Sequence, residues 1–274
     1  MQETVKQDRE KYIGGSDIPV IMNLSPFKSR YHLLLEKAGY REDKFEGNIY
    51  TEYGNTLEPK IRNYINNTFC TNDAGFIEGK HVREASGDEI IGVRIHTDGE
   101  NEDTILEIKT TPTIYENLED YKFYLVQILF YMLVADKKKG ILAVYERPED
   151  LSEELDPKRL QIFTFERESF NDLINQMAED IERFIEDLKL VKENPTITEE
   201  DLNPIDVTEI AQRIRAYEDQ LVYYEDTLRK LAKEKARLKN AMEAASVKSW
   251  ITQDGYKISL NSEGDIMINK QSEG

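Results

Sequence analysis

The sequence predicts an α/β fold with a central mixed sheet flanked by helices, followed by a C-terminal helical extension. Between residues 113 and 192, amphipathic helical segments alternate with short apolar strands, as expected when helices cover a sheet. Before them, residues 76–110 carry a hairpin pattern of two apolar runs around a polar turn. After them, residues 210–242 follow a heptad repeat.

The N-terminal part, residues 9–69, predicts a loop and two helices. Residues 14–17, Gly-Gly-Ser-Asp, are expected to form the loop. Ser29 can cap a helix that stops at Gly39. A second helix is expected from about Asn55, because apolar residues recur beyond it at helical spacing.

The middle of the chain supplies the predicted sheet. The dipeptide Asp98-Gly99 is expected to begin the turn of a hairpin whose two strands flank it. We expect strands at residues 90–96, 104–110, 140–145 and 160–165, and helices at residues 121–134 and 168–191.

The C-terminal part is set off by Pro195 and Pro204. Beyond them the heptad positions predict a coiled-coil helix, packed either on itself or on another subunit. Residues 250–260 predict a short β-hairpin around an Asp-Gly turn. We therefore expect a core at residues 1–193, a linker at 194–204 and a coiled-coil and β-hairpin extension at 205–274.

Composition excludes several classes of protein. A single cysteine, Cys70, rules out a disulfide framework, a cysteine-rich zinc site and an iron–sulfur cluster held by several thiolates. No run approaches the roughly 18 apolar residues of a membrane span, and the N-terminus lacks an apolar signal core. We expect a cytoplasmic protein.

The net charge of −18 argues, on average, against a nucleic-acid partner. The acidity is uneven, however, because residues 146–201 hold 18 acids and 7 bases. A nuclease needs local basic groups and bound cations, not a basic average. The simplest interpretation of the acidic stretch is a well-solvated surface.

Candidate chemistry centres on Asp98 and the triplet Glu107-Ile108-Lys109. Side chains two apart on a strand share a face, so Glu107 and Lys109 point the same way and Asp98 can converge on them. Two carboxylates suit Mg²⁺ or Mn²⁺, which can activate water beside a phosphodiester, and a lysine can orient that water. The triplet alone is weak, since an exposed surface ion pair has the same pattern.

Four blocks in order make the pattern specific, and they cover about residues 9–145. Together they resemble the YqaJ-like viral recombinase family, relatives of the phage lambda 5′–3′ exonuclease within the PD-(D/E)xK nucleases. The resemblance implies a restriction-endonuclease-like core. The blocks are residues 13–18 (Ile-Gly-Gly-Ser-Asp-Ile), 54–59 (Gly-Asn-Thr-Leu-Glu-Pro), 97–110 (from Thr-Asp-Gly to Leu-Glu-Ile-Lys-Thr) and 124–127 (Tyr-Leu-Val-Gln).

The resemblance also implies roles for individual residues. Asp98, Glu107, the main-chain carbonyl of Ile108 and, through water or a second ion, Glu58 match metal-binding positions. Lys109 matches the catalytic lysine. The remaining matches concern positioning and the DNA end: Gln127 and Tyr124 position the centre, Ser16 lies where the 5′ end is received, and Lys11 or Arg9 can pair with the 5′ phosphate.

Structural roles remain open for several of these residues. Glu58 can simply pair with Arg62 one turn away. Gln127 can be a buried polar residue bonded to backbone, and Ser16 can be a helix cap. None of the three histidines has metal-ligand spacing with another, and His96 is expected to be structural or to face substrate.

The activity that the resemblance implies is Mg²⁺-dependent 5′–3′ degradation of one strand of linear duplex DNA with free ends, leaving single-stranded tails for recombination. It also implies a homo-oligomeric ring, often a trimer, a single-strand annealing protein as partner, and a phage or prophage origin in a bacterial cytoplasm. Two alternatives remain. One is an endonuclease on the same fold, and the other is a non-catalytic protein that binds partners through its acidic surface and coiled coil.

Overall fold

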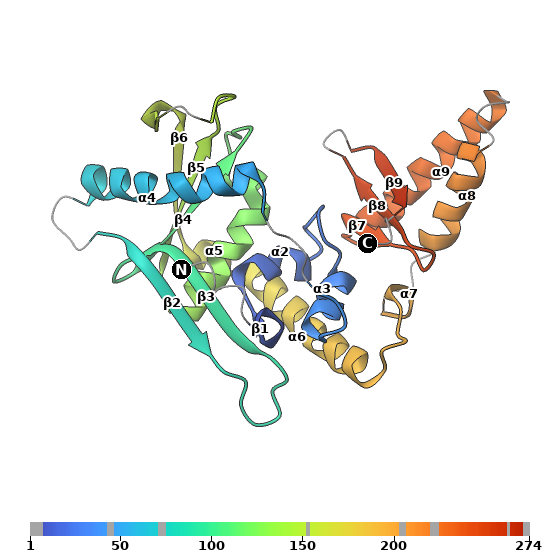
Figure 1. Cartoon of the computed structure of the whole chain (residues 1–274), viewed down its shortest axis with the longest axis horizontal. Helices are drawn as coiled ribbons and strands as arrows, with labels where there is room; N and C mark the ends of the chain where they lie inside the picture. Colours follow the sequence, from blue (N-terminus) through green and yellow to red (C-terminus); the bar gives the residue numbers. More distant parts are fainter. Residues whose placement is uncertain are drawn as a thin grey trace. The chain divides into compact units, whose positions relative to one another are not determined.

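A computed structural model of the chain describes residues 8–42, 47–70, 75–151, 154–202, 207–219, 225–261 and 264–270. The chain forms two compact units (Figure 1). The first unit contains residues 1–19 and 42–182, and the second contains residues 20–41 and 183–274. No helix of the described residues is long and apolar enough to cross a membrane.

A six-stranded mixed sheet organises the first unit, which confirms the predicted fold class. Its strands lie in the order β1-β3-β4-β5-β6, with β2 also paired to β3. The pairs β1–β3 and β4–β5 are parallel, and the pairs β2–β3, β3–β4 and β5–β6 are antiparallel. The strands are β1 (Tyr12–Ile13), β2 (Ile77–Arg83), β3 (Gly92–Glu100), β4 (Thr104–Thr111), β5 (Lys139–Glu146) and β6 (Leu160–Glu166).

Two helices cover opposite faces of this sheet. Leu106 and Ile108 of β4 pack in one cluster with apolar residues of α4 (Ile49–Phe69). Because side chains alternate along a strand, Glu107 points to the other face, where Gln127 of α5 (Lys122–Val134) contacts it. The other helices are α2 (Ile18–Ile21), α3 (Arg30–Lys37), α6 (Asn171–Glu193) and α7 (Glu199–Leu202), besides 3-10 turns that include η2 (Gly15–Asp17).

Helix α4 begins two turns earlier than the apolar spacing predicts. Asn48 caps it by accepting hydrogen bonds from the main-chain N–H groups of Tyr50 and Thr51. Gly54 lies inside the helix, where its missing Cβ leaves room for the Thr110 hydroxyl, 3.3 Å from the Cβ position. The predicted start near Asn55 was wrong, because residues 49–54 are already helical.

The predicted hairpin is confirmed by the antiparallel pair β3–β4, but its turn begins after Glu100 and not at Asp98-Gly99, because β3 continues to Glu100. Gly99 is paired with Leu106 on β4. A Cβ on Gly99 would lie only 2.9 Å from the Cβ of Phe76, so the glycine serves close packing and not a turn. Asp98 therefore projects from a strand.

Strands β3 and β4 separate at the level of Asp98. Their register pairs only Gly99 with Leu106 and Glu100 with Ile105. At the next residue, Asp98, the carboxylate Oδ2 accepts a hydrogen bond from the main-chain N–H of Ile108 at 2.7 Å. In a continuous sheet this N–H would instead bond to a main-chain carbonyl of β3. Because the two strands separate here, polar groups lie between them inside the sheet. These polar groups form the candidate site.

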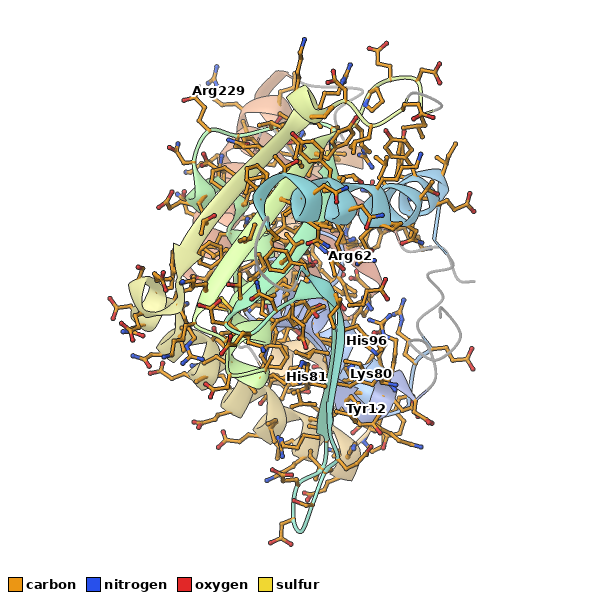
Figure 2. The ribbon with its side chains drawn as sticks, turned by 90° about the vertical axis from the view of Figure 1, so that its left-hand side faces the viewer. Tyr12, Arg62, Lys80, His81, His96 and Arg229 are labelled. Carbon is orange, nitrogen blue, oxygen red and sulfur yellow. The ribbon has the colours of Figure 1, made fainter. Side chains whose placement is uncertain are left out.

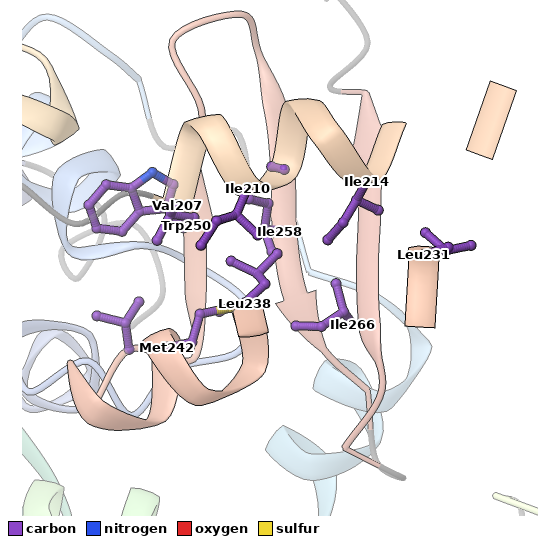
Figure 3. Packing of buried hydrophobic residues seen from close by; sticks show 11 residues of the cluster. Val207, Ile210, Ile214, Leu231, Leu238, Met242, Trp250, Ile258 and Ile266 are labelled. Atoms are coloured by element: carbon purple, nitrogen blue, oxygen red, sulfur yellow. The ribbon is translucent and has the colours of Figure 1, made fainter. Parts of the chain in front are cut away.

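The second unit has a core of its own (Figure 3). Helices α8 (Val207–Asp219) and α9 (Glu225–Ala244) pack against each other and share this core with strands β7 (Ser249–Ile251), β8 (Tyr256–Leu260) and β9 (Ile266–Lys270). Its buried residues include Val207, Ile210, Ile214, Leu231, Leu238, Met242, Trp250, Ile258 and Ile266.

The single helix predicted from the heptads is thus corrected to two helices, α8 and α9, and the predicted alternative that this segment packs on itself is confirmed. Both helices also pack against a small sheet. The spacing fixes which face of a helix is apolar, but it does not fix what covers that face. The predicted hairpin is confirmed by the antiparallel pair β7–β8, with Gly255 at φ +81° in its turn. Strand β9, which was not predicted, adds a third strand. The boundaries expected at residues 193 and 205 stay a prediction.

Candidate active site

The candidate active site starts from two acids on separated strands. Asp98 lies on β3 and is bound to the main-chain N–H of Ile108 on β4. Glu107 precedes Ile108 and is only 1% exposed. Its Oε2 atom is buried and has no hydrogen-bond partner among the described residues. A buried carboxylate oxygen without a donor destabilises the fold, so a group that binds this oxygen is expected.

The other oxygen of Glu107 is heavily bonded. Its Oε1 atom lies 2.5 Å from the Nζ of Lys109 and accepts a hydrogen bond from the Nε2 of Gln127 at 2.7 Å. The same amide nitrogen donates to the hydroxyl of Tyr131 at 2.8 Å. Lys109 and Gln127 come from different elements, β4 and α5, so the carboxylate is fixed from two sides. Lys109 also lies 5.7 Å from the ring centre of Tyr124, which brings that predicted residue to the site.

Helix α4 contributes Glu58 and its predicted partner Arg62, which has further contacts that the sequence did not predict. Arg62 pairs with Glu58 at 3.2 Å, and its side chain is 11% exposed. It also donates to the main-chain carbonyl of Asp98 and pairs with Glu78 of β2 at 2.6 Å. Arg62 therefore joins α4 to both strands. The i,i+4 spacing from Glu58 predicted only the first contact.

Burial controls the protonation of these acids. It raises the pKa of Glu107 to about 8, with help from the nearby charge of Asp98 and against the opposing charge of Lys109. Burial and the charge of Asp98 likewise raise the pKa of Glu58 to about 7, although Arg62 opposes the shift. The pKa of Asp98 is also raised by burial, against Lys109 and the bond from Ile108.

Lys109 titrates in the opposite sense. Burial alone would lower the pKa of its ammonium group, but the charges of Glu107 and Asp98 outweigh burial and raise it. Lys109 is therefore cationic at neutral pH. The centre combines acids that are hard to ionise with a base that stays charged.

The donor set fits a divalent cation. Three carboxylates compete to share one lysine and one arginine, and the partnerless Oε2 of Glu107 is an available oxygen ligand. Oxygen ligands are what Mg²⁺ and Mn²⁺ bind. Among the described residues, no three acid, histidine or cysteine side chains already stand together in a form that could hold a metal. Side-chain rotation would be needed to bring them together.

The Gly-Gly-Ser-Asp loop is tied to the same site. A Cβ on Gly15 would lie 2.1 Å from the ring of Tyr131, so only glycine allows the loop to approach this buried tyrosine. Tyr131 lies one turn after Gln127 on α5, a spacing that could have marked it in the sequence. The loop is thus connected to Glu107 by a chain of contacts through Tyr131 and Gln127.

The three residues expected at a DNA end are placed differently from one another. Arg9 donates a long hydrogen bond to the hydroxyl of Ser16 at 3.4 Å and lies 3.8 Å from Asp17. Lys11 pairs instead with Asp8 at 2.8 Å. Asp17 is buried and accepts the N–H of Gly14, which closes the loop. Arg9 and Ser16 are therefore brought together.

His96 lies two residues before Asp98 on β3 and does not touch a carboxylate in any described contact. Burial lowers the pKa of its imidazole, and the nearby charges of Lys80 and Arg94 lower it further. The sequence expectation that His96 is not a metal ligand stays a prediction. Its neighbours show that two cations lie close to it.

Comparison with known proteins gives a family. Residues 6–138 match the family model described as a YqaJ-like viral recombinase domain. No curated protein sequence matches the chain. Among solved structures, an alkaline exonuclease from Laribacter hongkongensis has 20% identity and a TM-score of 0.49, covering 70% of this chain and 94% of that one. A phage related exonuclease from Haemophilus somnus has 17% identity and a TM-score of 0.48, covering 66% and 96%.

The residues matched by the family model include Glu58, Asp98, Glu107, Lys109 and Gln127. The chain therefore carries a YqaJ-like viral recombinase domain, and the family predicted from its motifs is confirmed.

Proposed function

We propose that the chain is a Mg²⁺- or Mn²⁺-dependent DNA exonuclease that degrades one strand of linear duplex DNA from its 5′ end. The observation that carries the proposal is the buried group of Asp98, Glu107 and Lys109, with one carboxylate oxygen left partnerless. It lies in a domain of a viral recombinase family. The product would be a duplex with single-stranded tails for recombination.

The residues would divide the work as follows. Asp98, Glu107, Glu58 and the main-chain carbonyl of Ile108 would hold the metal, which supplies charge neutralisation at the scissile phosphate and a water of lowered pKa. Lys109 stays protonated and would orient the attacking water. Gln127 fixes the Glu107 carboxylate through its hydrogen bond. Tyr124 lies beside Lys109 and would limit the positions of its ammonium group.

The 5′ end of the DNA would be received beside the Gly-Gly-Ser-Asp loop. The contact between Arg9 and Ser16 supports this, because a guanidinium and a hydroxyl are both phosphate donors. Of the two bases, Arg9 is the candidate for the 5′ phosphate because it lies beside Ser16, whereas Lys11 pairs with Asp8. The proposal extends to a homo-oligomeric ring, with a trimer as first expectation, and to a single-strand annealing protein as partner.

The test uses linear duplexes labelled at either the 5′ or the 3′ end, together with closed circular DNA, each with and without Mg²⁺. We expect early loss of the 5′ label, no cutting of circles and no activity without metal. The variants Asp98→Asn and Lys109→Ala should lose about 10³-fold in rate, the scale of several kcal/mol of transition-state stabilisation. Asp103→Asn is the matched control, an acid on the nearby loop that pairs with Lys139 at 3.1 Å.

Other results would point elsewhere. Cutting of closed circles would replace the exonuclease by an endonuclease on the same fold, and early loss of the 3′ label would reverse the polarity. A chain that neither cleaves DNA nor binds Mg²⁺ or Mn²⁺ at millimolar concentration would be the non-catalytic interaction protein. The intact acids and lysine count against that last outcome.

A further inference from the structure

The strand pair β2–β3 carries a row of nitrogen-bearing side chains that leads away from Asp98. On β3, Arg94 and His96 lie on either side of the buried Ile95 and therefore share a face, and Asp98 follows two residues after His96. Lys80 on β2 is the direct register partner of His96, so its side chain belongs to the same face. Figure 2 shows Lys80 and His96 on one side of the strand pair and His81 on the other. We call Lys80, Arg94 and His96 the hairpin basic face.

Two acids of the same strand pair have described partners outside this face. Glu78, before Lys80 on β2, pairs with Arg62 at 2.6 Å. Glu84, just after β2, accepts the hydroxyl of Tyr12 at 2.7 Å. Neither of these two contacts involves Lys80 or His96, although the chain as a whole carries −18.

Arg94 of this face is fixed by packing, and His96 has one ring nitrogen without a hydrogen-bond partner among the described residues. Arg94 stacks over the ring of Tyr12, with 4.5 Å from its guanidinium carbon to the ring centre. The bond from Tyr12 to Glu84 fixes that ring in turn. The Nε2 atom of His96 is buried and has no hydrogen-bond partner among the described residues. Such an atom is costly unless something fills the position beside it.

We propose that the hairpin basic face binds the sugar–phosphate backbone of DNA beside the catalytic centre, an inference that rests on the proposed nuclease function. Same-face residues on a strand are about 7 Å apart, close to the separation of successive phosphates along a nucleic-acid strand. Phosphate oxygens accept from lysine, arginine and imidazole N–H groups alike. Because His96 lies two residues from Asp98 on β3, a DNA strand whose scissile phosphate lies at the centre would pass close to this row.

An acidic protein surface could also bind three basic side chains, but the position of the row favours DNA. A protein partner bound there would lie beside the carboxylates of Asp98 and Glu58, which repel acidic groups. A DNA backbone at the same place would be relieved of that repulsion by the divalent cation of the proposed reaction.

The test compares Lys80→Gln with Arg83→Gln. Both remove a cation from β2, but Arg83 is the register partner of Val93 and so projects from the opposite face, where it pairs with Glu89. Lys80 is exposed, so its replacement should leave folding intact. Binding of a fluorescent blunt duplex with a 5′ phosphate is measured in Ca²⁺ over a range of salt concentrations. Cleavage in Mg²⁺ is measured in parallel.

We expect Lys80→Gln to weaken duplex binding several-fold and to reduce the slope of log affinity against log salt by about 1, the loss of one phosphate contact. KM should rise, with kcat unchanged at saturating DNA. Adding His96→Gln should weaken binding further, while Arg83→Gln should behave as wild type.

If wild type cleaves DNA but Lys80→Gln keeps the wild-type affinity and salt slope, the hairpin basic face is wrong and the nuclease proposal stands. Equal losses in Lys80→Gln and Arg83→Gln would also overturn it, because they would show a general charge effect. Binding of an acidic protein that depends on Lys80, with duplex binding unchanged, would assign the face to the other partner. If wild type cleaves nothing, the proposed function itself fails.

Discussion

Each unit of the molecule buries a glutamate whose pKa is raised by a similar amount. Glu107 in the first unit is 1% exposed, and Glu199 in the second is 5% exposed. Burial is the main cause of the pKa shift in both, and it raises the pKa of each to about 8. By protonation behaviour alone the two residues could not be told apart.

Their neighbours separate them. Glu199 accepts the main-chain N–H of Ile251 at 2.9 Å, and the hydroxyl of Ser29 and the charge of Arg30 also favour its ionised form. No second carboxylate contributes to its shift. Glu107 lies instead with Asp98 and Glu58, whose charges raise its pKa further, and it keeps one oxygen without a partner.

A raised pKa therefore reports burial, whereas surplus negative charge beside a carboxylate oxygen without a partner indicates a place for a cation. Glu199 has a structural explanation. Ser29 caps α3 through the N–H of His32 while contributing to the environment of Glu199, so this glutamate links α3, α7 and β7 inside the second unit. Glu107 has no comparable structural explanation for its free oxygen.

The largest difference between Glu107 and Glu199 is expected when each acid is neutralised in turn. Glu107→Gln should lower the rate of duplex degradation by about 10³-fold, because the proposed metal loses a charged ligand. Glu199→Gln should leave the rate unchanged, since nothing in its surroundings connects it with the centre. Release of acid-soluble nucleotides in Mg²⁺ measures both. Equal losses in the two variants would mean that either change simply damages folding.

A second, smaller effect tests whether the hydrogen bond from Gln127 positions the Glu107 carboxylate. Gln127→Leu removes the donor to Oε1 and keeps the approximate size of the side chain. Groups that orient a metal ligand typically contribute 10- to 100-fold to metal affinity, so we expect Mn²⁺ binding by calorimetry to weaken by about that factor. Gln161→Leu on β6 is the matched control. Unchanged Mn²⁺ affinity in Gln127→Leu would leave Gln127 with the purely structural role that the sequence also allowed.

The contrast between the two glutamates also marks what the sequence could predict. The spacing of Glu107 and Lys109 predicted a shared face, and the salt bridge between them at 2.5 Å agrees with it. The contact of Arg62 with the carbonyl of Asp98 was not predictable, because it depends on the separation of β3 from β4. Periodicity describes one element at a time and contains no information on where two strands part.

Other misses have the same origin. An Asp-Gly pair predicts a turn, but the glycine at position 99 is needed because Phe76 packs against it from another segment. A heptad repeat predicts an apolar stripe, but the cover of that stripe includes Trp250 and Ile266 from beyond the helices. The burial of Glu199 was not predictable, because it lies in a run of acidic residues. Nothing in the local sequence distinguishes the one buried acid from its exposed neighbours.

The last test concerns stability and uses the pH dependence of Glu199. Its pKa is raised from 4.5 to about 8 in the folded chain, so its protonated form stabilises the fold. That contribution is fully present below pH 4.5 and is lost as the pH rises through 8. The shift corresponds to a difference of about 5 kcal/mol in the free energy of unfolding across this window.

Urea unfolding followed by Trp250 fluorescence measures this effect, since the single tryptophan lies in the core of the second unit. Between pH 5 and 9, wild type should lose stability relative to Glu199→Gln, whose amide oxygen can still accept the N–H of Ile251. Glu193→Gln, an exposed acid at the end of α6, should follow wild type. A parallel pH dependence in wild type and Glu199→Gln would show that the bonds from Ile251 and Ser29 compensate burial in full, and the likeness between Glu199 and Glu107 would then disappear.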